Sequence, residues 1–364
     1  MKSKINQTRF ENGPVVLTDY MPGVRSVTVG FFYRFGSRNE PNELNGITHF
    51  IEHCVFKGTA KRTAMDIAIE QDRLGGALDA FTTYEETGFV IKVIDEQTER
   101  AFDLVSDMLT NPRFDETDLE NEQRVIIEEM KMNEDSPEEV LSDIFHREFF
   151  PAHPLGMSIT GTPETVRSFG HESTHKFHER AFSPENLIVA AAGNIEHDLL
   201  LELVERGHSC PQHSNADRNV RVPVPAAPVV VQHRPDLEQA HLIVAVPFVG
   251  ARDERRYAAD LLESILGGGT SSRLWQKVRE ERGLAYNIGA STVMFRDCGY
   301  FAVSVATSPT QVEEVVDITV AEIARVVREG VSDEELSLMK DQSRAAILLD
   351  LEDSASRAGS LAQC

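Results

Sequence analysis

The chain has 364 residues, with 59 Asp or Glu against 36 Lys or Arg, and its formal net charge is −23. This excess of negative charge argues against binding to nucleic acid or to anionic membrane surfaces. The length exceeds that of one ordinary domain and predicts two, and no apolar run approaches the length of a membrane span.

The cysteines and the N-terminus both favour the cytoplasm. Cys54, Cys210, Cys298 and Cys364 form no close-spaced pair, which is typical of a reducing compartment. The first residues lead into Gly13 without the apolar core and cleavage site of a secretory signal. We therefore expect a cytoplasmic protein that does not associate with membranes.

The first predicted elements are strands over 15–18 and 25–35, the second of them rich in β-branched and aromatic residues. A polar loop then leads into a predicted helix that carries His49, Glu52 and His53. These residues spell H-x-x-E-H, and helix positions i, i+3 and i+4 share one face.

Two imidazoles one turn apart can bind a single metal ion, and the carboxylate beside them can act on bound water. Apolar residues occupy the other side of this helix, namely Ile47, Phe50, Ile51 and Cys54. Chance alone would produce the three motif letters in roughly a few per cent of chains this rich in His and Glu. Zinc also needs a third protein ligand and an open fourth position, so the motif by itself is an incomplete site.

A second predicted helix, over 63–74, ends at two glycines and precedes an antiparallel strand pair over 77–83 and 87–94. If 79–83 forms the edge of a sheet, an extended peptide can add to it through main-chain hydrogen bonds. Most strand edges bind nothing, so the residues alone leave this open. Further helices are predicted over 96–110, 115–133, 138–149 and 162–182. A buried strand is predicted over 187–192.

The predicted helix over 116–134 supplies a candidate third ligand. Leu119, Ile126 and Met130 form its apolar stripe, and Glu122 and Glu129 lie two turns apart on the shoulder of that stripe. A carboxylate at a buried edge is costly unless a cation lies beside it. Glu129 is therefore the candidate ligand and Glu122 a candidate partner of a ligand. Without a metal, both would be ordinary residues at the border of the core.

This combination resembles the pitrilysin and mitochondrial-processing-peptidase family, whose members pair H-x-x-E-H with a distant Glu in a V-I-x-x-E context. Here that context is Val125-Ile126-Ile127-Glu128-Glu129. The similarity spans nearly the whole chain, and the other segments that resemble family motifs are 49–59, 74–83, 153–156, 190–194 and 266–286. The resemblance implies a zinc metalloendopeptidase with one Zn²⁺ per chain, held by His49, His53 and Glu129, and with Glu52 as the acid–base residue.

The resemblance also implies roles for residues outside the metal centre. Ala80, Phe81 and Thr82 would face the backbone of a peptide or unfolded, presequence-like substrate. Arg279 and Tyr286 would hold the substrate and stabilise the tetrahedral intermediate, and in relatives of this subunit length they come from the partner chain. A homodimer or a heterodimer with a related subunit is therefore expected. Taken without the family, Arg279 would be a surface charge and Tyr286 a core aromatic residue.

Residues 211–228 contain several prolines and little apolar periodicity, so we predict a linker there. It would divide a catalytic domain, 1–210, from a second domain, 229–364. In the second domain, strands are predicted over 229–232, 241–247, 286–295 and 300–306, and helices over 255–266, 271–282, 311–329 and 334–351.

The two halves look like copies of one unit. Aligning Gly269-Thr270 with Gly58-Thr59 places Asp260, Glu263 and Ser264 at the three positions of the zinc motif, so the second copy cannot form the same site. The predicted fold is α+β, with two homologous domains, each a largely antiparallel sheet with helices packed on one face.

One alternative function stays open. Relatives of this family also serve as non-catalytic peptide-binding or structural partner subunits, although such members typically lack one or more of the ligands that this chain retains. Family subunits usually continue for some tens of residues beyond the last residue of this chain, so the second domain is expected to be incomplete at its C-terminus.

Overall fold

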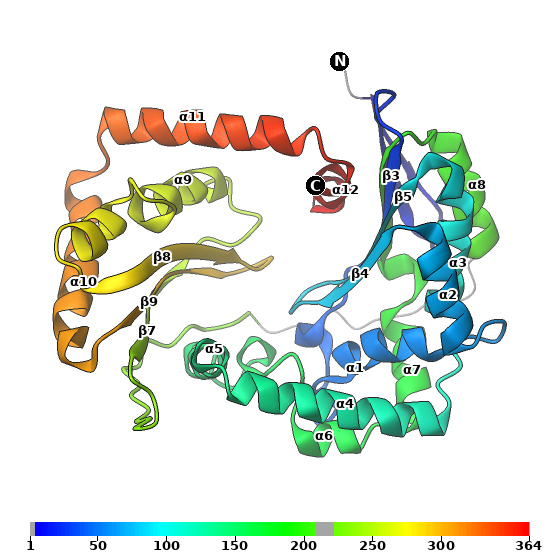
Figure 1. The fold of residues 1–364 in the computed structure, drawn as a ribbon, viewed down its shortest axis with the longest axis horizontal. Helices are drawn as coiled ribbons and strands as arrows, with labels where there is room; N and C mark the ends of the chain where they lie inside the picture. The colour runs from blue at the N-terminus through cyan, green and yellow to red at the C-terminus, as the bar shows by residue number, and fades with distance from the viewer. Residues whose placement is uncertain (1–3, 209–221, 364) are drawn as a thin grey trace. The chain divides into compact units, whose positions relative to one another are not determined.

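The computed structural model describes residues 4–208 and 222–363, and the chain divides into two compact units (Figure 1). Unit 1 comprises Met1–Met132, Met157–Val220 and Leu349–Cys364, and unit 2 comprises Asn133–Gly156 and Arg221–Leu348.

This division corrects the predicted domain boundaries in two places. Asn133–Gly156 groups with unit 2, and Leu349–Cys364 groups with unit 1. Of the predicted linker, residues 211–221 lie outside the described residues, and 222–228 have no regular secondary structure. The prediction assigned these two segments to a domain by their position along the chain. Their packing groups each of them with the other unit.

Unit 1 contains a six-stranded sheet in the order β1-β2-β6-β3-β5-β4, in which only β2 and β6 are parallel. Its strands are β1 (Lys4–Arg9), β2 (Val15–Tyr20), β3 (Ser26–Tyr33), β4 (Ala77–Thr82), β5 (Thr87–Ile94) and β6 (Leu187–Gly193). The central strand β6 is buried along its whole length, as expected for an apolar run covered on both faces. The terminal strand β1 was not predicted, and β4 forms the edge, as the proposed strand addition requires.

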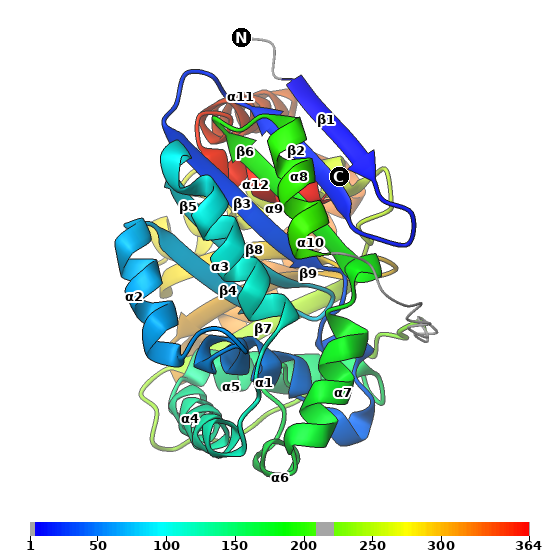
Figure 2. The ribbon, with the colours of Figure 1, turned by 90° about the vertical axis from the view of Figure 1, so that its right-hand side faces the viewer.

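Alternating residues of β3 face opposite sides of this sheet. Val27, Val29 and Phe31 belong to the main core of unit 1. The helices that contribute to this core are α1 (Ile47–Cys54), α2 (Ala64–Leu74), α3 (Thr98–Thr110), α4 (Glu116–Glu134), α6 (Pro163–Arg167), α7 (His171–Ala181) and α8 (His197–Gly207). In Figure 2, α3 and α8 lie across this face of the sheet.

The opposite face of the sheet is covered by α12 (Ser354–Gln363), which follows unit 2 in the sequence. The hydroxyls of Thr28 and Ser354 are 2.8 Å apart, and Arg357 forms an ion pair with the buried Asp19. Leu361 packs in a small apolar cluster with Phe32 of β3. The last helix of the described chain therefore adds a second covered face that the prediction did not include.

The predicted helix over 162–182 is in fact two helices, α6 and α7. The chain leaves helical geometry before α7, and Gly170, the residue preceding that helix, is extended. Phe169 is fully buried at this break, and its ring lies 5.3 Å from that of Phe50 on α1. The break between α6 and α7 thus coincides with the burial of the Phe169 ring. Local composition does not reveal that burial.

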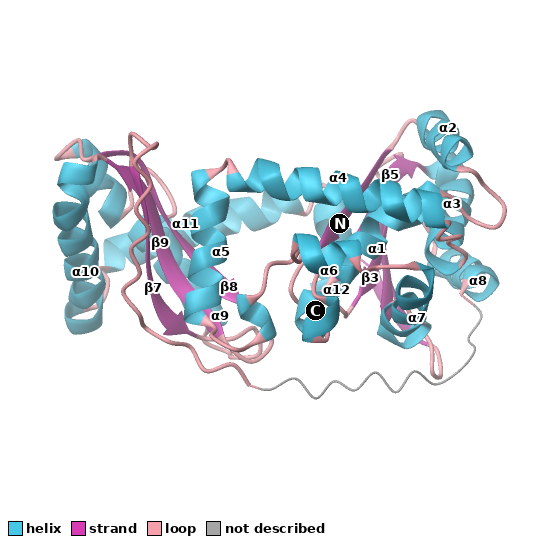
Figure 3. Cartoon of the chain, turned by 90° about the horizontal axis from the view of Figure 1, so that it is seen from below, coloured by secondary structure: helices cyan, strands magenta, loops and turns pink. Residues whose placement is uncertain are grey.

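Unit 2 contains a three-stranded antiparallel sheet in the order β7-β9-β8. Its strands are β7 (Ala240–Phe248), β8 (Ala285–Met294) and β9 (Gly299–Thr307), and its helices are α5 (Pro137–Phe149), α9 (Arg256–Gly267), the π-helix η7 (Trp275–Glu280), α10 (Val312–Glu329) and most of α11 (Asp333–Asp350). Helices α9 and α10 share a core with β9, while α5 packs against Tyr300 on the other face (Figure 3).

The strand predicted over 229–232 is absent from unit 2. Val229 is 96% exposed and Val231 is 86% exposed, so these β-branched residues have no sheet to pack against in the described part of the chain. No helix in the described ranges is both long enough and apolar enough to cross a membrane.

The two units repeat one arrangement. Unit 1 runs β3, α1, α2, β4, β5, α3, and unit 2 runs β7, α9, η7, β8, β9, α10. The corresponding strands are ordered β3-β5-β4 and β7-β9-β8 in their sheets. The predicted α+β fold with two similar, antiparallel-rich domains is therefore confirmed.

Candidate metal centre

Helix α1 presents the candidate ligands because its other side is anchored in the core. Its apolar residues Ile47, Phe50, Ile51 and Cys54 are at most 1% exposed. The chain enters the helix through Gly46, whose φ is +95°, and a Cβ at this position would lie 2.6 Å from the carbonyl oxygen of Thr160. Only glycine combines this conformation with this close approach.

Glu40 caps the N-terminus of α1 from the preceding loop. Its Oε2 accepts a hydrogen bond from the backbone N–H of Gly46, and its Oε1 accepts one from that of Thr48, both at 2.7 Å. These bonds satisfy N–H groups that have no partner within a helix. Burial raises the pKa of Glu40 to about 7, although its hydrogen bonds favour the ionised form.

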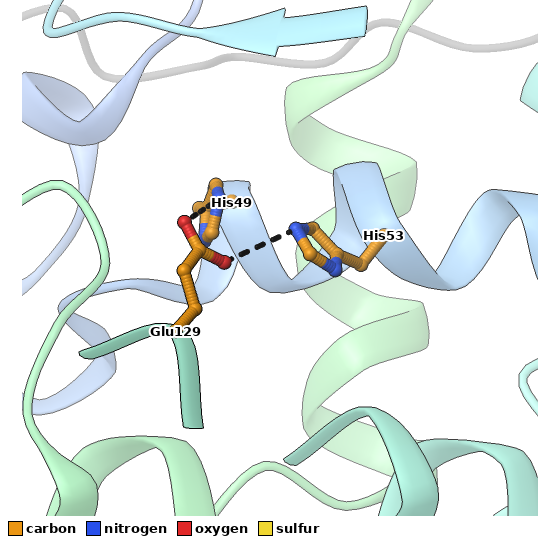
Figure 4. Close-up of side chains that lie close together, drawn as sticks. All are labelled: His49, His53 and Glu129. Carbon is orange, nitrogen blue, oxygen red and sulfur yellow. Dashed lines mark ion pairs between the residues drawn. The ribbon is translucent and has the colours of Figure 1, made fainter. Parts of the chain in front are cut away.

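The side chains of His49, His53 and Glu129 converge on one point from α1 and α4 (Figure 4). Nε2 of His49 lies 3.8 Å from Oε1 of Glu129, and Nε2 of His53 lies 3.7 Å from Oε2. The three candidate ligand atoms lie within 4.8 Å of one another. Ligands about 2.1 Å from a tetrahedral zinc ion would be roughly 3.4 Å apart, so this set fits zinc with small side-chain adjustments.

Glu122 lies behind this set, next to His53. Its Oε2 is 3.4 Å from Nδ1 of His53 and its Oε1 is 2.7 Å from the ammonium group of Lys57. A proton on Nδ1 of His53 leaves Nε2, which faces Glu129, free to bind a metal. Lys57 was not among the predicted residues, although it follows His53 by one helical turn in the sequence.

The protonation of the two imidazoles differs. Burial, with the charge of His53 adding to it, lowers the pKa of His49 to about 3, so this ring is neutral and able to bind a metal at ordinary pH. Burial alone would also lower the pKa of His53, but the hydrogen bond to Glu122 and the surrounding carboxylates outweigh it and raise that pKa. Nδ1 of His49 is buried and has no hydrogen-bond partner among the described residues.

Glu52 stands apart from the three converging side chains. It is 8% exposed, and its Oε2 accepts a hydrogen bond of 2.8 Å from the hydroxyl of Thr82. Burial raises the pKa of Glu52, and the charge of Glu129 raises it further, while Thr82 and His53 oppose the shift. A divalent cation would offset this accumulation of carboxylates, so the charges as well as the donor atoms fit a metal ion.

The residues predicted to meet a substrate strand lie on β4. Ala80 packs on the α1 side of the sheet, and Phe81 packs on the other side, where its ring lies 6.5 Å from that of Phe32. The bond between Thr82 and Glu52 was not predicted, because nothing in the sequence indicates which side chains of α1 and β4 meet. That these residues contact a substrate stays a prediction.

Arg279 and Tyr286 are neighbours in unit 2. The guanidinium carbon of Arg279 lies 5.0 Å from the ring centroid of Tyr286 and 4.3 Å from that of Trp275. Tyr286 is 82% exposed, so it is not a core aromatic residue. Trp275 was missed, although its spacing of four from Arg279 on a predicted helix is a usable signal. The catalytic roles of Arg279 and Tyr286 stay predictions.

Comparison with known families covers both units. The family model described as "Insulinase (Peptidase family M16)" matches residues 15–163, and that described as "Peptidase M16 inactive domain" matches residues 168–343. An uncharacterised zinc protease of Mycobacterium leprae is 38% identical over 357 residues, which cover 96% of this chain and 79% of that protein. The uncharacterised zinc protease YmxG of Bacillus subtilis is 34% identical over 353 residues, covering 97% and 86% of the two chains.

Solved structures show the same fold. A protease from Helicobacter pylori superimposes with a TM-score of 0.91 at 22% identity, covering 98% of this chain and 88% of that one. A protein from Pseudomonas fluorescens, described as a peptidase M16 inactive domain, gives a TM-score of 0.87 at 18% identity, with coverages of 98% and 86%.

Proposed function

The chain belongs to peptidase family M16, and we propose that it is a zinc-dependent endopeptidase. The observation that carries this proposal is the convergence of His49, His53 and Glu129, with Glu52 close by but held separately by Thr82. Two imidazoles and one carboxylate leave a coordination position open, which is the arrangement of catalytic zinc sites. One Zn²⁺ per chain follows, because the second unit lacks both imidazoles.

When bound, zinc supplies a Lewis acid that lowers the pKa of water towards about 7 and stabilises negative charge on a carbonyl oxygen. His49, His53 and Glu129 would hold it. Glu52 would take the proton of the attacking water and deliver it to the leaving amine. Its burial favours the first step, because a carboxylate whose pKa is raised above its ordinary value takes a proton from water more readily.

The substrate we propose is a peptide or an unfolded, presequence-like segment in extended conformation. Strand β4 lies at the edge of its sheet and pairs only with β5 in the described part of the chain. A peptide added along Ala80, Phe81 and Thr82 would run past Glu52, which binds the last of them. The net charge of −23 favours basic segments.

We also propose that Arg279 and Tyr286 act on the substrate from a partner chain in a homodimer or a heterodimer. Their support here is that the structure places them in contact and leaves Tyr286 exposed. A phenol and a guanidinium group are suitable hydrogen-bond donors to an oxyanion and to a substrate carbonyl group. A reducing, cytoplasmic location is part of the same proposal, and the free thiol of Cys54 agrees with it.

The direct test is to purify the protein, measure its zinc content and incubate it with a peptide library with and without a chelator. We expect about one zinc per chain, together with cleavage that the chelator abolishes and added zinc restores. In Glu52→Gln the zinc should remain while turnover falls on the order of 10³-fold or more. A non-catalytic partner subunit would show neither zinc-dependent cleavage nor any effect of Glu52→Gln, and that result would replace the enzyme by the alternative.

The contribution of the partner chain can be tested by mixing two inactive variants. Glu52→Gln retains Arg279 and Tyr286, while Tyr286→Phe retains the whole metal centre. If these residues act across a homodimer, mixing should restore roughly a quarter of the wild-type rate, since half of the dimers are mixed and each holds one intact site. No recovery after confirmed exchange of subunits would place Tyr286 outside the site of its partner.

A further inference from the structure

We propose that Thr82 is a positioning residue for Glu52, so that the strand proposed to receive the substrate also orients the group that moves the proton. This inference rests on the proposed function and assigns Thr82 a role beyond contact with the substrate. It begins from one contact, the 2.8 Å hydrogen bond that the Thr82 hydroxyl donates to Oε2 of Glu52. A glutamate side chain has three rotatable bonds, so its carboxylate needs such a contact to keep one orientation.

The geometry of a strand allows Thr82 to perform this task while a peptide is bound. Side chains leave a strand perpendicular to the sheet, whereas the hydrogen bonds to an added strand lie in its plane. The hydroxyl of Thr82 therefore does not compete with a peptide that adds to the edge of β4. Binding of such a peptide would instead restrict the motion of β4 and, with it, the carboxylate of Glu52.

The position of Thr82, the last residue of β4, is itself fixed by the β4–β5 hairpin. Thr82 pairs with Thr87 of β5, and the hydroxyl of Thr87 donates a buried hydrogen bond of 2.9 Å to the carbonyl oxygen of Phe35. The loop after β3 then binds the hairpin tip directly, with the N–H of Ser37 donating to Thr83 and that of Arg38 to Tyr84. The end of β4 is thus tied to the chain that leads into α1.

A buried ion pair strengthens this attachment. Arg38 is 1% exposed and contacts Oε1 of Glu85 in the hairpin tip at 2.5 Å. Two residues later in the same loop, Glu40 binds the first N–H groups of α1. We call the segment from Gly36 to Glu40 the latch. It connects the β4–β5 tip, which carries Thr82, to the start of the helix that carries Glu52.

The latch leaves little space for adjustment at its first residue. A Cβ on Gly36 would lie 2.4 Å from the carbonyl oxygen of Thr83. The distance between Thr82 and Glu52 is therefore set by two rigid elements and a closely packed loop. Thr82 is held in place by the main chain, so its hydroxyl is a fixed reference for the carboxylate.

The experiment compares Thr82→Val, which removes the hydroxyl but keeps a β-branched side chain on the strand, with Thr82→Ser, which restores it. Thr292→Val is the matched control, because Thr292 lies on the edge strand β8 of unit 2 and its hydroxyl has no hydrogen-bond partner among the described residues. For each variant, zinc content, kcat and KM are measured with one peptide.

We expect Thr82→Val to keep its zinc and to change KM less than twofold, while kcat falls about tenfold because the carboxylate is no longer held in its productive orientation. Thr82→Ser should recover most of kcat, and Thr292→Val should match the wild type. A Thr82→Val variant with kcat within twofold of the wild type, or with its loss confined to KM, would overturn the inference.

A second measurement does not depend on activity. In chelated protein, a double-mutant cycle with Thr82→Val and Glu52→Ala measures the coupling of the two side chains in the unfolding equilibrium. We expect the double variant to deviate about fivefold from the product of the single effects, and additive effects would overturn the inference. Coupling in a wild-type protein that hydrolyses nothing would instead overturn the proposed function, and with it the catalytic purpose of Thr82.

Discussion

In both units a helix lies against the edge strand of the sheet, α1 beside β4 in unit 1 and α9 beside β8 in unit 2. The glutamates at equivalent motif positions, Glu52 and Glu263, each accept a hydrogen bond from that strand. Glu52 accepts from the side chain of Thr82, whereas Glu263 accepts from the backbone N–H of Thr292 at 2.7 Å. The same framework therefore holds a carboxylate beside the candidate metal centre in one copy and binds it to the main chain in the other.

The two strand edges differ accordingly. A Cβ on Gly267 of α9 would lie 2.4 Å from the backbone nitrogen of Ala290, so α9 approaches the main chain of β8 closely. Glu263 occupies the backbone N–H of Thr292, a donor that an added strand would need. A covered edge cannot accept a further strand, and this is one way in which proteins prevent unwanted strand pairing. The difference agrees with the proposal that only unit 1 combines the candidate metal centre with a strand edge able to receive a peptide.

The loops after the first strand of each repeat also differ. In unit 2 the N–H of Ala251 donates to the carbonyl oxygen of Phe295 in the β8–β9 turn, much as Ser37 binds Thr83 in unit 1. Unit 1 adds the buried pair of Arg38 and Glu85, and Ala251 occupies the equivalent region of unit 2.

The largest expected effect tests whether metal binding is confined to unit 1. Glu129→Gln removes the anionic ligand, so we expect loss of bound zinc and a fall in kcat/KM on the order of 10³-fold. Asp260→Asn, at the position in α9 equivalent to His49, should change neither quantity. Metal analysis and peptide hydrolysis check both variants, and full zinc occupancy in Glu129→Gln would remove that residue from the ligand set.

The next effect concerns the latch. Glu85→Ala removes a carboxylate that pairs with the buried guanidinium group of Arg38, and we expect a loss of about 2 kcal/mol in the free energy of unfolding. Glu96→Ala breaks an exposed pair with Arg25 and should leave the denaturation midpoint unchanged. Denaturant titrations measure both. If the two variants lost the same amount of stability, Glu85 would stabilise the latch no more than an exposed surface pair does.

The carboxyl groups at the starts of α1 and α9 should make the free energy of unfolding depend on pH in opposite directions. The pKa of Glu40 in the folded protein is about 7, above its ordinary value, so its ionisation costs stability as pH rises through 4.5 towards 7. Relative to Glu40→Gln, the wild type should lose about 3 kcal/mol between pH 4.5 and 7.5. Taking the difference between these two proteins removes the contributions of His49 and Glu52, which titrate in both. Parallel stability curves would contradict the burial of an ionisable carboxyl group.

The start of α9 can be tested between pH 4 and pH 2. Asp253 accepts a hydrogen bond from the N–H of Arg255 at the start of α9, and its side-chain hydrogen bonds to Arg255 lower the pKa of Asp253 to about 2. Its stabilising contribution is present above pH 4 and is lost as pH falls towards 2. The free energy of unfolding of Asp253→Asn should therefore depend less on pH than that of the wild type between pH 4 and pH 2, and only there.

The smallest effect concerns the glutamate of unit 2. Glu263→Ala removes the acceptor of the Thr292 N–H, and we expect a loss of about 1 kcal/mol in the free energy of unfolding. The value of kcat/KM per folded molecule should change less than twofold. A large loss of turnover would show that Glu263 takes part in the reaction and that the two glutamates have not diverged in role.

The sequence by itself determined the repeated framework and the residues of the candidate metal centre. The spacing of His49, Glu52 and His53 is a property of one helix, and the apolar stripe of α4 indicated Glu129 and Glu122 as the residues at its border. Such periodic patterns depend on local geometry, so they are readable without a fold. The same reasoning found most strands and helices.

Only the tertiary structure decided which separate elements meet. It pairs Thr82 with Glu52, Glu85 with Arg38 and Thr292 with Glu263, and it returns α12 to the sheet of unit 1 after the chain has built unit 2. It also left the valines around residue 229 without a partner strand in the described part of the chain, although their composition favours one. These outcomes depend on contacts between residues far apart in the chain, for which local propensity and periodicity carry no information.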